Sequence, residues 1–270
     1  MLLSAAFYTH SAAALGYAIF VVLLAVWGER SRLAALMGLA AGLTAAWGMA
    51  WALFDLGSCP AGVLGLTSTL RDAGWLTVVL AILATGRERD RVWRGLAVAV
   101  AVTLTIDAIF GATSLNLGAF AGVSIDSQIT RICVTILGLI LVENLMRNVS
   151  ADEFWAVKSL GIGLTAIFAF NLILRIPQFL IHTSDEGLVA AQPIVFLMAL
   201  PLFLMAAVRS PSLRLGIHSS RRLVFHTATL VAAGVLLQGT AIAAYYIRNY
   251  GGTTATVLSV LVIFSVLIGL

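Results

Sequence analysis

The chain has 270 residues, of which 61% are hydrophobic and only 10% are charged. Soluble domains carry about 25% charged residues, so this composition excludes a soluble globular protein. The formal net charge of +4 comes from short basic segments with no folded module among them, so we expect contact with anionic membrane lipids and no binding of nucleic acid.

Nine apolar segments of membrane-spanning length follow one another along the chain. A helix needs about 20 apolar residues to cross the hydrocarbon core of a bilayer. We therefore predict an all-α fold, a polytopic transmembrane bundle that occupies residues 1–270 as a single domain. The expected spans are residues 5–27, 33–56, 66–85, 95–115, 127–146, 156–181, 188–208, 223–247 and 254–270.

Basic residues collect in alternate gaps between these spans. All but four of the 16 lysines and arginines lie within residues 28–32, 86–94, 147–158 and 209–222. Short loops rich in Lys and Arg stay cytoplasmic, which predicts a multi-pass protein of the bacterial inner membrane with its N-terminus outside and its C-terminus in the cytoplasm. The last span reaches Leu270 without a flanking Trp, Tyr, Lys or Arg, so we expect the natural chain to continue into a cytoplasmic domain.

Three of the four remaining basic residues fall at one depth within the expected spans. At the helical rise of about 1.5 Å per residue, Arg71, Arg131 and Arg175 lie roughly 24–26 Å from the cytoplasmic ends of their spans. Buried charges in lipid need partners, so we expect Asp107 to pair with Arg131 or with another of these arginines. We call the whole set the outer polar layer; its members are Arg71, Asp72, Asp107, Arg131, Asn171 and Arg175.

Two interpretations of the outer polar layer remain open. In the first, its charged groups satisfy one another and fix the register of the helices. In the second, the layer is a ligand or signal site, and its excess of Arg over Asp would suit an anionic ligand.

The remaining polar residues give weaker signals. Glu143 and Arg147 are spaced to pair on one helix face near the cytoplasmic side. The histidines are dispersed, and only His10 and His182 share a level, so we expect no metal site. Neither a catalytic group nor a cofactor is expected in this chain.

Small residues recur every fourth position along the second span. Alanine and glycine allow helix backbones to approach closely in a membrane. We therefore expect this stripe to pack against a neighbouring helix; it comprises Ala34, Gly38, Gly42, Ala46 and Ala50.

Two stretches resemble a known family. Residues 143–148 with Trp155 and Lys158, and residues 220–226 followed by 244–252, resemble the N-terminal multi-span region of PrsK-like sensor histidine kinases, which belong to the exosortase/PEP-CTERM system of Gram-negative bacteria. The resemblance covers essentially the whole chain. On the cytoplasmic side it singles out a helix-end motif made of Glu143, Asn144, Arg147, Trp155, Lys158, Arg221 and Arg222.

The resemblance implies the sensor module of a two-component kinase that regulates envelope, exopolysaccharide or protein-sorting functions. The intact protein would be a homodimer whose later domains bind ATP and Mg²⁺, phosphorylate a histidine and pass the phosphoryl group to a response regulator. This chain stops before any such domain, so no catalytic residue is carried over.

The alternative function is a transporter for a small molecule or a carrier lipid, or a membrane subunit. Transporters are often built from internal repeats. We find no convincing repeat, and nine spans do not divide evenly, so this alternative ranks second.

Overall fold

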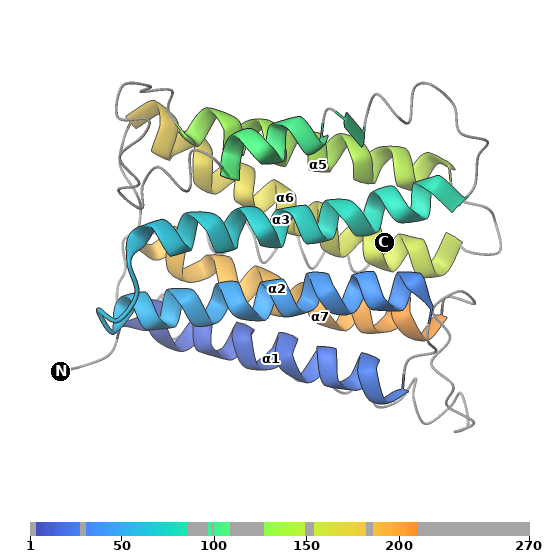
Figure 1. The fold of residues 1–270 in the computed structure, drawn as a ribbon, viewed down its shortest axis with the longest axis horizontal. Helices are drawn as coiled ribbons and strands as arrows, with labels where there is room; N and C mark the ends of the chain where they lie inside the picture. Colours follow the sequence, from blue (N-terminus) through green and yellow to red (C-terminus); the bar gives the residue numbers. More distant parts are fainter. Residues whose placement is uncertain are drawn as a thin grey trace.

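The computed structural model describes residues 4–27, 31–85, 97–98, 100–108, 127–148, 154–181 and 186–209. Within these ranges every regular element is a helix (Figure 1). Six helices there are long and apolar enough to cross a membrane, which makes the chain a helical membrane bundle. They are α1 (Ala5–Trp27), α2 (Arg32–Asp55), α3 (Ala61–Thr85), α5 (Ser127–Asn148), α6 (Phe154–Ile181) and α7 (Glu186–Arg209).

These six helices coincide with six of the expected spans, and residues 97–98 and 100–108 are helical inside the expected span 95–115. The largest difference is at α3, which begins at Ala61 and not at residue 66. Gly57 adopts a positive φ of 71° and ends α2, and Pro60 stands directly before α3, where its fixed φ suits a helix start. The connection is therefore short. The expected spans 223–247 and 254–270 lie outside the described residues.

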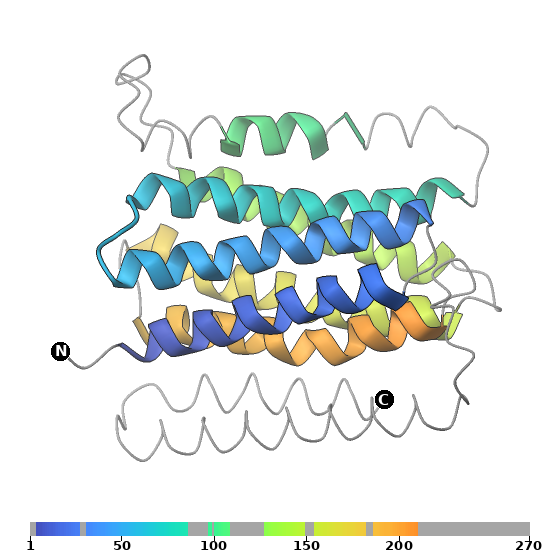
Figure 2. The same cartoon turned by 60° about the horizontal axis from the view of Figure 1, so that its bottom comes forward.

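The helices form a closed ring. Each of α1, α2, α3, α5, α6 and α7 contacts the next in this order, and α7 returns to contact α1. Figure 2 shows the helical residues 100–108 beside α3, on the outside of the ring.

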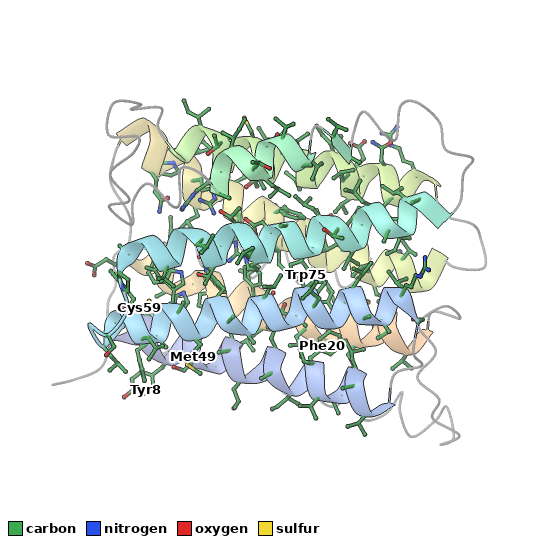
Figure 3. The ribbon with its side chains drawn as sticks, in the orientation of Figure 1. Tyr8, Phe20, Met49, Cys59 and Trp75 are labelled. Carbon is green, nitrogen blue, oxygen red and sulfur yellow. The ribbon has the colours of Figure 1, made fainter. Side chains whose placement is uncertain are left out.

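Aromatic side chains fill the centre of this ring. The rings of Trp75 on α3 and Phe203 on α7 meet with centroids 4.4 Å apart, and Tyr17 on α1 lies edge-on to Trp75 at 6.4 Å. All three side chains are buried, and Figure 3 labels Trp75 at mid-length of the bundle. The Trp75 indole also donates to Thr44 on α2 over 3.0 Å, so its polar nitrogen is satisfied.

The two ends of the bundle differ in charge. We call the end where α1, α3, α5 and α7 begin the first end (left in Figure 1), and the opposite end the second end. Arg32, Arg147, Lys158 and Arg209 all lie near the second end. This agrees with the expected grouping of basic residues on one side of the membrane; that this side is cytoplasmic remains a prediction.

The expected packing stripe on α2 is wrong for two of its members. A Cβ at Gly38 would meet no heavy atom within 4 Å, and Ala46 is exposed. Close packing occurs at Gly48 instead, where a Cβ would lie 2.8 Å from the His10 carbonyl oxygen on α1. The reason is geometric: residues four apart are offset by roughly 40° around a helix, so a five-member stripe winds about 160° and cannot face one neighbour.

Candidate functional site

The residues of the outer polar layer lie in the half of the bundle nearer the first end. Five of them are buried, and the sixth, Arg131, has a side chain that is 20% exposed. They come from α3, residues 100–108, α5 and α6. Their individual partners differ.

Arg71 is held between two aromatic rings. Its Nε and Nη2 atoms donate to Oδ1 of the adjacent Asp72 over 2.9 and 2.8 Å. Its guanidinium carbon lies 4.3 Å from the Trp47 ring centroid on α2 and 4.6 Å from that of Phe196 on α7. A desolvated cation is stabilised by such ring faces. Arg71, fully buried, thus joins three helices of the ring.

Asp107 forms the expected ion pair. Arg131 Nε lies 3.5 Å from Asp107 Oδ1, as their matching depths predict. Asp107 also accepts hydrogen bonds from Thr69 on α3 and, over 3.1 Å, from Thr130 on α5. Its carboxylate therefore links α3 to α5.

Asn171 pairs with a residue that the sequence analysis missed. Gln192 Nε2 on α7 donates to Asn171 Oδ1 on α6 over 2.7 Å, and both side chains are buried. The available signal was that Gln192 is the only amide in an otherwise apolar span. Asn171, an amide of the same kind, was counted in the layer, but Gln192 was not.

Arg175 is the charged member of the outer polar layer that has no oppositely charged partner among the described residues. It is 5% exposed, and within the described part of the chain no carboxylate forms an ion pair with it. With Arg71 paired to Asp72 and Arg131 paired to Asp107, the layer carries one unbalanced positive charge.

Buried polar atoms without a hydrogen-bond partner follow a single pattern. Among the described residues, every such side-chain atom is a nitrogen. All of them lie in the half of the bundle nearer the first end. They are His10 Nε2, Trp51 Nε1, Arg71 Nη1, Arg131 Nε, Asn171 Nδ2 and Arg175 Nε. What this half of the bundle lacks is acceptors.

His10 is a core residue that packs among aromatic rings. Its ring stacks on Trp51 with centroids 5.0 Å apart and meets Trp47 edge-on at 5.2 Å. Its Nδ1 lies 2.8 Å from the Ala6 carbonyl oxygen. In the parts of the chain that the structure describes, no group of three or more His, Cys, Asp or Glu could hold a metal ion. His182 lies outside these parts.

The helix-end motif lies near the second end, where Glu143 and Arg147 are exposed and Asn144 and Lys158 are half-buried. Arg147 Nη2 donates to Glu143 Oε1 over 2.6 Å, with both side chains more than half exposed, as their spacing predicts. The Asn144 amide donates to the Ile140 carbonyl over 3.3 Å. Trp155 and Lys158 lie in the first turns of α6, where the Trp155 side chain is not described. Arg221 and Arg222 lie outside the described residues.

Comparison with known proteins found no matching family model, no similar curated protein and no similar solved structure.

Proposed function

We propose that this chain is the membrane-embedded input module of a PrsK-like sensor histidine kinase, and that the outer polar layer receives its signal. The observation that carries the proposal is the burial of four charged side chains in one half of an apolar bundle, beside a fifth, Arg131, that is 20% exposed. Burying an ion costs several kcal/mol, and apolar replacements of buried ion pairs are often neutral or stabilising. Folding alone does not require such a layer, and intramembrane charges commonly mark functional sites.

The contacts of the layer suit it to changing the arrangement of the ring. Arg71 touches α2 and α7, Asp107 links α3 to α5, and Asn171 joins α6 to α7. A signal that alters these contacts would change how the helices pack at the second end. A ligand shifts such an equilibrium only by its different affinity for the two arrangements.

The filled centre of the ring favours a receptor over the alternative transporter. On the side of the layer that faces the second end, the described interior is packed with the buried side chains of Tyr17, Trp75 and Phe203. Every buried charged side chain that the structure describes lies nearer the first end. A polar layer at one end, next to an interior packed with aromatic side chains, suits sensing better than passage of a solute.

The test is autophosphorylation of the full-length protein from the native gene, measured in membrane vesicles with labelled ATP. Arg175→Gln removes the unbalanced charge and should change basal autophosphorylation by about threefold or more, because a change of 0.65 kcal/mol in a two-state equilibrium shifts it by this factor. The matched control is Arg32→Gln, an exposed arginine at the second end, which should leave it unchanged.

Two results would refute the proposal. The first is a native coding sequence with no kinase region after Leu270. The second is equal autophosphorylation in wild type, Arg71→Gln, Arg131→Gln and Arg175→Gln, which would reduce the layer to scaffolding.

A further inference from the structure

We infer that the outer polar layer binds an oxyanion, a carboxylate or phosphate group, at the unpartnered nitrogens of Arg71, Asn171 and Arg175. This inference rests on the proposed function and deepens it by naming the chemical class of the input. Its site can nevertheless be tested by binding alone, without any kinase activity.

The unpartnered nitrogens belong to one connected group of helices. Asn171 and Arg175 are one turn apart on α6, so their side chains share a face. Asn171 accepts from Gln192 on α7, and Phe196, one turn further along α7, packs on the Arg71 guanidinium. Arg71 on α3 and Asn171 on α6 therefore contact the same stretch of α7, one helical turn apart.

An oxyanion supplies what the layer lacks. A buried N–H without an acceptor is costly, and the described half-bundle holds only nitrogens in this condition. Water would offer acceptors without removing the excess positive charge that Arg175 leaves. A carboxylate or phosphate does both, and hydrogen bonds between charged groups are the stronger kind.

The donors are also held in place before any ligand arrives. Asp72 occupies Nε and Nη2 of Arg71, and the rings of Trp47 and Phe196 fix the guanidinium plane, which leaves Nη1 available. Asn171 is fixed through its oxygen by Gln192, which leaves Nδ2 available. Donors fixed in this way lose little freedom on binding.

The experiment measures thermal unfolding of the 270-residue chain, purified in a neutral detergent, with increasing phosphate or acetate against chloride at matched ionic strength. We expect a saturable rise in Tm with at least one of the two anions. Arg175→Gln should weaken the apparent affinity by about tenfold or more, since it removes a charged donor. Arg32→Gln should bind as wild type does and reports any general salt effect.

A lipid headgroup carries the same chemistry as free phosphate, so the source is resolved in nanodiscs. If the lipid is the source, phosphatidylglycerol should raise Tm above that in phosphatidylcholine, and added phosphate should then have no further effect. If the source is a free anion, Tm should be the same in both lipids and should still rise with phosphate or acetate.

A second variant keeps the inference falsifiable if Arg175→Gln fails to fold. Asn171→Asp is nearly isosteric, retains the oxygen that Gln192 donates to, and replaces the unpartnered Nδ2 by a charged acceptor. It should unfold at a higher temperature than wild type in the absence of added anion, and it should lose the anion response. An added buried carboxylate ordinarily destabilises a protein, so the sign of this change is diagnostic.

The inference is overturned if neither the two anions nor phosphatidylglycerol raises Tm, or if Arg175→Gln responds as wild type does. It is also overturned if Asn171→Asp is less stable than wild type and keeps the anion response. Altered autophosphorylation in Arg175→Gln without anion binding would refute the oxyanion site and leave the sensor function standing. Anion binding with unaltered autophosphorylation would support the oxyanion site and refute the sensor function.

Discussion

Two alanine substitutions on α2 test how closely α1 and α2 pack. A Cβ at Gly48 would lie 2.8 Å from the His10 carbonyl oxygen and 3.0 Å from the Ala14 backbone nitrogen, both on α1. These are backbone atoms and cannot turn aside, so α1 as a whole must move away. A Cβ at Gly38 on the same helix would meet nothing within 4 Å.

The magnitude follows from two opposing effects. Alanine is a better helix former than glycine by about 1 kcal/mol, and this gain applies at both positions. Overpacking a closely packed interface costs about 1–3 kcal/mol, and this cost applies only at Gly48. The helix-forming gain cancels in the comparison, so Gly48→Ala should be less stable than Gly38→Ala by about 1–3 kcal/mol.

The assay is reversible unfolding in mixed micelles, with helix content followed as the denaturing detergent is increased. Gly38→Ala should be at least as stable as wild type. Equal stabilities of the two alanine variants would refute the reasoning, because they would mean that α1 does not approach Gly48 in the folded protein.

Two further predictions concern the ion pair and the orientation. Asp107→Leu should destabilise the bundle by about 3 kcal/mol, because it removes the charged partner of Arg131 and the carboxylate to which Thr69 and Thr130 donate. Adding Arg131→Leu should recover part of this loss, and strictly additive effects in the double variant would contradict the pairing. In a Cys133→Ala variant, Cys59 in the turn between α2 and α3 should react with an impermeant maleimide in intact spheroplasts. In a second variant, which also lacks Cys59 and carries Ser212→Cys, the introduced cysteine should react only after lysis. The opposite result would reverse the predicted orientation.

Depth along the helices was predictable from the sequence. The length of an apolar segment sets where a helix enters and leaves a bilayer, and six expected spans agree with the helices of the structure. The constant rise per residue then placed Asp107 level with Arg131, and the two residues do pair. Both inferences depend on position along the helix axis alone.

Rotation about the helix axis was not predictable in the same way. The predicted stripe of small residues spaced four apart failed at Gly38, because whether a residue faces a neighbour depends on which helices flank its own. Hydropathy does not reveal the order of the helices around the ring. The same limit hid the contact of Arg71 with Trp47 and Phe196, which joins residues far apart in the sequence. Gln192 was missed for the same reason, because its hydrogen bond to Asn171 joins two helices whose facing sides depth alone does not give.

The way in which Arg71 is stabilised also bears on what the outer polar layer can bind. A second carboxylate would stabilise this cation, but it would occupy the remaining N–H donors and cancel the positive charge. The ring faces of Trp47 and Phe196 stabilise the guanidinium without accepting any of its in-plane N–H groups. Arg71 therefore stays buried, charged and partly unsatisfied at the same time. A layer selected only for stability would be expected to complete its hydrogen bonds internally, whereas a layer that receives an anion has to keep some of its donors open.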